Sequence, residues 1–178
     1  MLLLAFLAVV TWLGGRGRDE PEAEPFADLD TRLNYALWDF HAQLLDDDGR
    51  LQLEINAPML RNNASSQVGT VENPRIRVRQ DDDEWHISSD SAIITADREH
   101  VSLIGHVDFL RQGKSSADRL EIRTRDVMLN VTPRTASTEA AVALAQNQDR
   151  LEANGMKLDM KANSYELLDQ VRGSYARP

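Results

Sequence analysis

Apolar and polar residues alternate at every second position over most of the chain beyond residue 34. In the first such segment, the apolar side chains share one face of an extended backbone, and they are Ala36, Trp38, Phe40, Ala42 and Leu44. A period of two is typical of a β-strand that buries one face. The run Asp-Asp-Asp-Gly at 46–49 supplies turn residues, and the alternation resumes over 51–57. The pattern therefore predicts a β-hairpin.

The same arrangement recurs further along the chain. Apolar alternation at 76–78 and 85–87 flanks an acidic turn, and alternation at 101–109 returns through 120–131. Segment 137–147 is ambiguous, because its alanines favour a helix while its other apolar residues keep the spacing of a strand. We predict a strand there, and an all-β protein as a whole.

An internal repeat underlies these hairpins. An apolar residue followed two positions later by a small one recurs at spacings of 32, 35 and 29 residues, in Ile55-Asn56-Ala57, Ile87-Ser88-Ser89, Ile122-Arg123-Thr124 and Leu151-Glu152-Ala153. Gly105, Gly155 and Gly173 also recur at comparable places, which predicts β-bulges or close approaches between strands. The domain over 34–178 is therefore predicted to be a stack of similar antiparallel hairpins.

The N-terminal segment has a different character. Residues 1–13 are apolar except for Thr11, and the stretch that follows contains mainly glycine, proline and charged residues. A helix of about 14 residues reaches about 20 Å, whereas the hydrocarbon core of a bilayer is about 30 Å thick. We expect a membrane anchor over 1–14 whose first residues are missing from this sequence, followed by an acidic linker over 15–33. Two other interpretations stay open, the apolar region of a signal peptide and a buried amphipathic helix.

Composition narrows the chemistry that the chain can perform. The 178 residues include 29 acidic and 20 basic ones, and the resulting net charge of −9 disfavours binding to nucleic acid. The absence of cysteine excludes zinc–thiolate sites, iron–sulfur clusters, thiol nucleophiles and disulfide bonds. The histidines lack metal-binding spacing, and no serine lies in a G-x-S-x-G motif. We therefore expect no metal, no cofactor and no enzymatic activity.

The segments that carry the hairpin repeat also resemble a known family. They are LQLEINAPML (51–60), VENPRIRV (71–78), WHISSDSAII (85–94), VSLIGHVDFLRQG (101–113), LEIRTRDVMLNV (120–131), LEANGMKLDM (151–160) and LLDQVRGSY (167–175). Their order and spacing resemble the LptC family, the membrane-anchored component of the bacterial lipopolysaccharide export system, over about 140 of 178 residues. The soluble relative LptA shares the repeat, and the apolar N-terminal segment favours LptC.

The resemblance implies a fold, a location and partners. It implies an OstA/LptA-like β-jelly-roll with an N-terminal transmembrane helix, anchored once in the inner membrane with its main domain in the periplasm. The domain would receive lipopolysaccharide from an ABC transporter of LptB, LptF and LptG at its N-terminal edge, near 35–44, and pass it to LptA at its C-terminal edge. Two alternatives are an adaptor that joins partners by strand pairing without holding lipid and, more distantly, a secreted carbohydrate-handling enzyme.

A lipid carrier needs a continuous apolar lining, because acyl chains are costly to expose to water. The candidates for this lining are the inward apolar residues Trp38, Phe40, Leu53, Ile55, Ile76, Val78, Ile87, Leu103, Val107, Phe109, Ile122, Leu129, Val142 and Leu158. The candidates for the LptA-facing edge are Val142, Leu144, Met156, Leu158 and Val171. We expect His41 and Arg111 to be exposed. From sequence, each lining candidate could equally belong to a closed core.

Overall fold

The computed structural model describes residues 33–45, 48–80, 83–113 and 119–174. These residues form ten β-strands: β1 (Leu33–Leu45), β2 (Leu51–Asn63), β3 (Gly69–Glu72), β4 (Arg75–Gln80), β5 (Asp83–Ile94), β6 (His100–Gln112), β7 (Leu120–Asn130), β8 (Thr135–Gln146), β9 (Asp149–Asp159) and β10 (Ser164–Ser174). The all-β prediction is confirmed for this part of the chain. The ambiguous segment 137–147 is a strand, because it lies almost wholly within β8.

The predicted anchor over 1–14 and all but the last residue of the predicted linker over 15–33 lie outside the described residues. Among the residues that are described, no helix has the length and apolar character needed to cross a membrane.

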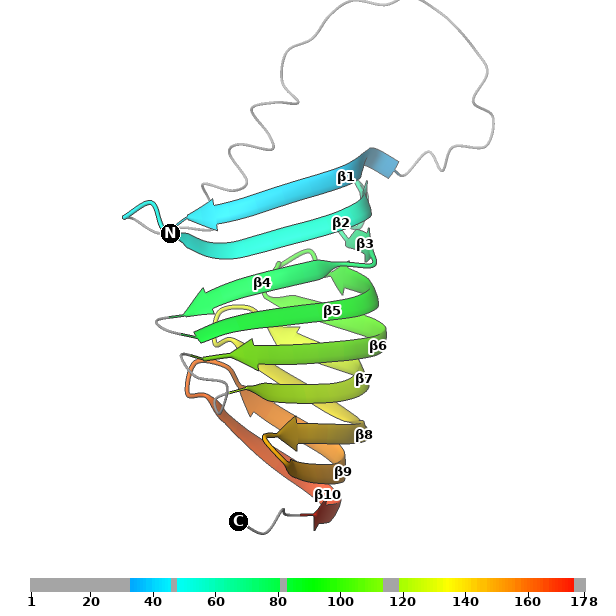
Figure 1. The fold of residues 1–178 in the computed structure, drawn as a ribbon. Helices are drawn as coiled ribbons and strands as arrows, with labels where there is room; N and C mark the ends of the chain where they lie inside the picture. Colours follow the sequence, from blue (N-terminus) through cyan, green and yellow to red (C-terminus); the bar gives the residue numbers. More distant parts are fainter. Residues whose placement is uncertain (1–32, 46–47, 81–82, 114–118, 175–178) are drawn as a thin grey trace, which may run out of the picture. The chain divides into compact units, whose positions relative to one another are not determined.

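The strands form one antiparallel sheet in which sequence neighbours are spatial neighbours (Figure 1). The order is β1-β2-β3-β5-β6-β7-β8-β9-β10, and β4 pairs with both β2 and β5. Strands β3 and β4 thus share one position in the sheet, interrupted where Asn73 has a φ of 43° and Pro74 has no N–H to donate. The predicted stack of antiparallel hairpins is confirmed for the described strands.

Most of the long strands bend near their midpoints. The pairing register shifts at mid-strand between β5 and β6, β6 and β7, β7 and β8, β8 and β9, and β9 and β10. Residues with positive φ mark several of the bends, at Gly105, Asp126, Gly155 and Gln170. The prediction of irregular backbone at Gly105 and Gly155 is confirmed. At Gly173 it is wrong, because Gly173 keeps regular pairing with Leu151 and the bend in β10 lies at Gln170.

The bends divide the sheet into two facing walls. Wall A contains the strand halves that carry Trp85, Phe109 and Ile122, and wall B contains those that carry Leu103 and Leu158. All five residues are 0–2% exposed. A single sheet leaves one face open, and the described residues contain no helix to cover it, so each wall must be buried by the other. Figure 1 shows the yellow and orange strand segments passing behind the green ones.

Side chains stabilise the bend by accepting and donating backbone hydrogen bonds. The N–H of His106 donates to the Asp90 carboxylate at 2.8 Å, and the N–H of Gly105 donates to the Asp126 carboxylate at 3.0 Å. The Thr138 hydroxyl donates to the carbonyl of Arg125 at 2.9 Å. These bonds satisfy backbone groups that the shifted register leaves without ladder partners. The hydrogen bond from Gly105, aided by Arg125, lowers the pKa of Asp126.

The sequence repeat marks this bend. The small residue of each repeat is buried and lies directly before the bend of its strand or, in β2, before Pro58. These residues are Ala57, Ser89, Thr124 and Ala153. Pairing places Ser89 beside Val107 and Val107 beside Thr124, so the small residues lie on the inner side of the bend, along the line where the two walls meet. Small side chains are required there because the two walls converge.

Candidate functional site

Apolar side chains form a continuous row on the inner surface of wall A. Cross-strand pairing joins each member to the next, through Ala42 in β1, Ile55 in β2, Ile76 in β4, Ile87 in β5, Phe109 in β6, Ile122 in β7, Leu144 in β8 and Leu151 in β9. The row is a consequence of register, because partners in an antiparallel ladder point to the same face. It provides an apolar path from the N-terminal edge strand to β9.

The lining candidates on β5 to β9 form a closed core in this structure. Their side chains are at most 8% exposed, and they are Ile87, Leu103, Val107, Phe109, Ile122, Leu129, Val142 and Leu158. They belong to one contiguous cluster in which wall A packs on wall B. Any ligand that occupies this space must therefore separate the walls or displace side chains.

The candidates on the first strands are less covered. Phe40, Leu53, Ile55, Ile76 and Val78 are only partly buried. Trp38 is 67% exposed, because it lies on an edge strand and Asp39, with a φ of 48°, interrupts the alternation beside it. The apolar interior is thus filled at β5 to β9 and more open at β1, β2 and β4.

Two edge strands bound the sheet. Among the described residues, β1 pairs only with β2 and β10 only with β9. Unpaired backbone groups on such edges are available for pairing with another chain. Of the residues expected at the C-terminal edge, only Val171 lies on β10, where it is 51% exposed. Val142, Leu144, Met156 and Leu158 are buried on the internal strands β8 and β9, because the final hairpin adds one more strand beyond them.

A polar residue, Arg111, lies on the inner surface of wall A near its tip, the end at which β6 terminates and β5 begins. Arg111 is the second-last residue of β6 and pairs with Trp85 and Leu120 on the neighbouring strands. Its guanidinium lies 5.9 Å from the centre of the Trp85 ring. The expectation that Arg111 is exposed is wrong, because it shares the inward face with Phe109 two residues earlier. The alternation along β6 predicts this inward orientation, because Arg111 is two residues after the inward Phe109.

Among the described residues, one side-chain hydrogen bond joins the tips of the two walls. The side-chain amide of Asn163, in the turn after β9, donates to the carboxylate of Asp83 at the start of β5 over 2.6 Å. Both groups are exposed, so water competes for this bond and its net contribution is small. The sequence offers no signal for this contact, because the partners are 80 residues apart.

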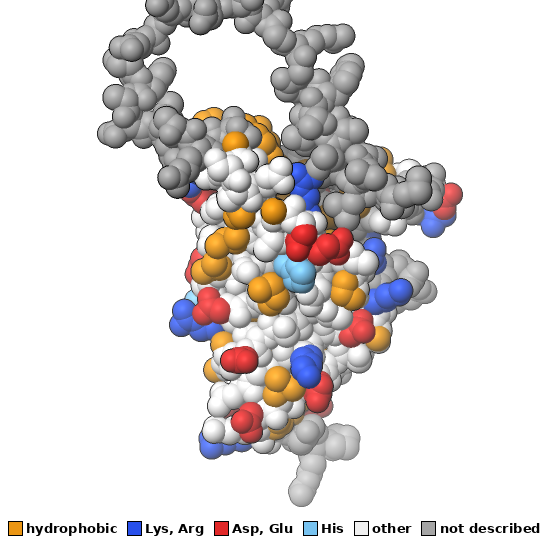
Figure 2. Space-filling view, turned by 180° about the vertical axis from the view of Figure 1, so that it is seen from behind, with side chains coloured by type: hydrophobic (Ala, Val, Ile, Leu, Met, Phe, Trp, Pro, Cys, Tyr) orange, Lys and Arg blue, Asp and Glu red, His pale blue; other side chains and the backbone are white. Residues whose placement is uncertain are grey.

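Charged side chains occupy the outer face of wall A. Arg79 lies 2.9 Å from the Glu84 carboxylate, and Arg77 lies 3.1 Å from Glu54 and 3.6 Å from Glu84. Burial acts to raise the pKa of Glu84, but the hydrogen bond from Arg79 and the charges of His86 and Arg77 outweigh it, so the pKa is lowered. On the opposite face of the molecule, seen in Figure 2, charged groups are also spread among hydrophobic patches. The described residues contain no group of three or more histidines and carboxylates arranged to hold a metal.

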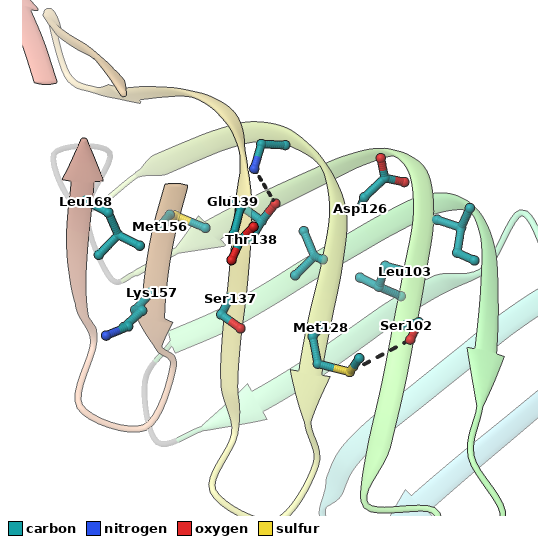
Figure 3. A pocket seen from close by; sticks show the side chains of 13 residues that line it. Ser102, Leu103, Asp126, Met128, Ser137, Thr138, Glu139, Met156, Lys157 and Leu168 are labelled. Atoms are coloured by element: carbon teal, nitrogen blue, oxygen red, sulfur yellow. Dashed lines mark hydrogen bonds between the residues drawn. The ribbon is translucent and has the colours of Figure 1, made fainter. Parts of the chain in front are cut away.

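A separate hollow of about 660 Å³ lies over strands β6 to β10. Figure 3 shows Leu168 and Lys157 on one side of this hollow and Met128 and Ser102 on the other. Ile104, Met128 and Leu168 are 38–43% exposed, so this surface faces away from the core. The Ser102 hydroxyl lies 3.8 Å from the Met128 sulfur. Nothing here forms a nucleophile and base pair, and we assign no catalytic role to the hollow.

Comparison with known families gives one clear finding. A family model described as LptC, "Lipopolysaccharide-assembly, LptC-related", matches residues 1–176. No curated protein matches the chain significantly. The family match spans every described strand as well as the N-terminal segment.

Proposed function

The chain belongs to the LptC family of lipopolysaccharide-assembly proteins, and on this premise we propose that its apolar interior holds the acyl chains of lipopolysaccharide. Family membership gives the chain a role in lipopolysaccharide transport, on the periplasmic side of the inner membrane and in the company of other Lpt components. The family is not one of enzymes. In the proposed relay, the domain receives lipopolysaccharide from a transporter of LptB, LptF and LptG and passes it to LptA.

The observation that carries this proposal is the apolar row from Ala42 to Leu151. A lipid can move across a protein without a large free-energy barrier only if its acyl chains contact apolar surface at every step. At about 0.8 kcal/mol per CH₂, exposing five methylenes at a polar gap costs about 4 kcal/mol. The row has no polar member, so an acyl chain sliding along it meets no such barrier.

The closed core determines how the lipid enters. Because β5 to β9 are filled with side chains, acyl chains enter the more open strands first, near Phe40 and Ile55, and separate the walls as they advance. The bond between Asn163 and Asp83 resists this separation only weakly. In this scheme, the β1 edge faces the transporter and the β10 edge, with Val171, faces LptA.

The test is site-specific photo-crosslinking to lipopolysaccharide. A photoreactive amino acid is placed at the inward positions Phe40 and Phe109, each with an outward neighbour, His41 and Asp108, as its matched control; Ile87 is a third inward position. We expect adducts at the inward positions and none at the controls. Equal labelling of inward and outward positions contradicts the proposal.

One observation favours the alternative of an adaptor that pairs strands without holding lipid. Ile122 and Met156 are 0% exposed, so the interior is already filled by protein. If every inward position fails to crosslink in protein shown to be folded by circular dichroism, the adaptor is the better account of the fold.

A further inference from the structure

The inner surface carries one cation that no described carboxylate neutralises. Arg111 continues the inward face formed by Val107 and Phe109, and its Nε atom is buried without a hydrogen-bond acceptor. No ion pair involving Arg111 is found among the described residues, whereas arginines on the outer face, such as Arg77 and Arg79, do contact carboxylates. An inward charge with a buried, unpaired N–H group is costly unless something compensates it.

A second unpaired donor lies beside it. Trp85 is 1% exposed, and its indole Nε1 is buried without an acceptor. Trp85 and Arg111 are cross-strand partners on the same inward face, with the guanidinium 5.9 Å from the ring centre. The great majority of buried N–H groups in proteins have an acceptor, so two such groups without one, on neighbouring residues, indicate a shared acceptor supplied from outside the chain.

We propose that Arg111 and Trp85 bind a phosphate group of an amphiphile whose acyl chains lie along the apolar row. This inference rests on the proposed function and adds the recognition of the head group. A guanidinium presents a planar fork of donors that matches phosphate oxygens, and the indole N–H adds one more donor. Phosphate is favoured over an uncharged acceptor because it also neutralises the inward cation.

The position of the pair fits an amphiphile. Two residues further inside β6, Phe109 belongs to the apolar row, which places the row about 7 Å from Arg111 along the strand. Next to Arg111 on β7 is Leu120, which is 1% exposed. A phosphate at the tip of wall A and acyl chains beside Phe109 and Ile122 would thus satisfy the polar and the apolar groups together. Lipopolysaccharide carries phosphates close to its acyl chains.

The experiment compares two lipids on the full-length protein. Lipid A with its phosphates and enzymatically dephosphorylated lipid A each displace a fluorescent acyl-bearing reporter, and the ratio of their affinities measures phosphate recognition. Hydrogen bonds to a charged group support a preference of about tenfold or more for the phosphorylated form. We expect Arg111→Met to abolish this preference by lowering the affinity for phosphorylated lipid A.

Two further variants keep the test decisive. Trp85→Phe retains the ring and loses only the donor, and we expect it to reduce the preference by about threefold or more. Arg123→Met removes a cation that is 74% exposed on the outer face, and we expect it to leave the preference intact. An unchanged preference in folded Arg111→Met, or in Trp85→Phe if the first variant does not fold, overturns the inference.

The outcomes separate this inference from the proposed function. If the wild-type protein binds neither lipid, the proposed function fails. If it binds both lipids equally, the acyl-chain proposal stands and the phosphate site is wrong. Inorganic phosphate is added as a competitor: we expect no displacement at concentrations equal to the lipid, and displacement there would assign the site to free phosphate instead.

Discussion

The bend at Gly105 makes the strongest prediction about how this fold is stabilised. A methyl group added at Gly105 would lie 2.1 Å from the Oδ2 atom of Asp90 and 2.8 Å from its Cγ. Asp90 must therefore move, and it gives up the hydrogen bond that it accepts from the N–H of His106 at 2.8 Å. The φ of 81° adds strain for any residue with a Cβ.

The magnitude follows from these two terms. Left-handed backbone costs an L-residue about 1–2 kcal/mol, and a lost hydrogen bond to a charged group costs about 1.5–3 kcal/mol. Gly105→Ala should therefore destabilise the domain by about 3–5 kcal/mol. For a domain of this size, that corresponds to a fall in Tm of about 10–15 °C.

The assay is urea and thermal unfolding followed by circular dichroism, with Gly49→Ala as the matched control. Gly49 has a φ of 77° but no atom within 4 Å of the added methyl group, so it reports backbone strain alone, about 1–2 kcal/mol. The additional Asp90→Ala change should recover part of the loss in Gly105→Ala, because it removes the contacts with Oδ2 and Cγ and leaves only the 2.9 Å approach to Cβ. Equal destabilisation of the Gly105 and Gly49 variants would refute this reasoning.

Three further predictions test the core, the tips and a turn. Ile122→Ala, at a position that is 0% exposed, should cost about 2–5 kcal/mol in urea unfolding. Asp83→Ala, which removes the acceptor and leaves the backbone of Asn163 unchanged at its φ of 51°, should remove about 0.5 kcal/mol at the wall tips and speed hydrogen exchange there and lipid uptake. Hydrogen bonds from Thr95, Glu99 and His100 lower the pKa of Asp97 to about 2. The stability that the Asp97 carboxylate contributes is therefore present above about pH 3.8 and is lost as the pH falls through about 2. An NMR titration of Asp97 measures this pKa.

Each of these has a control or a contrary result. Ile104→Ala, on the outer face and 38% exposed, should change stability by no more than about 0.5 kcal/mol. Asn154→Ala, an exposed amide on β9, should leave exchange at the tips unchanged. A pKa near 3.8 for Asp97 would show that its hydrogen bonds do not persist in solution.

The sequence alone determined the strands, their order and the faces that they bury. Alternation is a local property, since neighbouring side chains on a strand point to opposite faces whatever lies beyond them. For this reason, 101–109 and 120–131 were identified as strands, and Phe109 and Ile122 as inward residues. The repeat predicted the stack of hairpins, but only the structure showed that its small residues, such as Ser89 and Thr124, lie where the two walls converge.

Tertiary structure decided how far each inward face is covered. Trp38 and Phe109 occupy similar positions in the local pattern, yet one is 67% exposed on an edge strand and the other 1% exposed between two walls. Tertiary structure also decided the position of the C-terminal edge of the sheet, which lies on β10 and not on β8 or β9. Burial depends on contacts between residues far apart in the chain, such as Asn163 and Asp83, and no period in the sequence encodes such contacts. The orientation of Arg111 was predicted wrongly for a different reason. Its charge favoured an exposed position, whereas its register in β6 places it on the inward face beside Trp85.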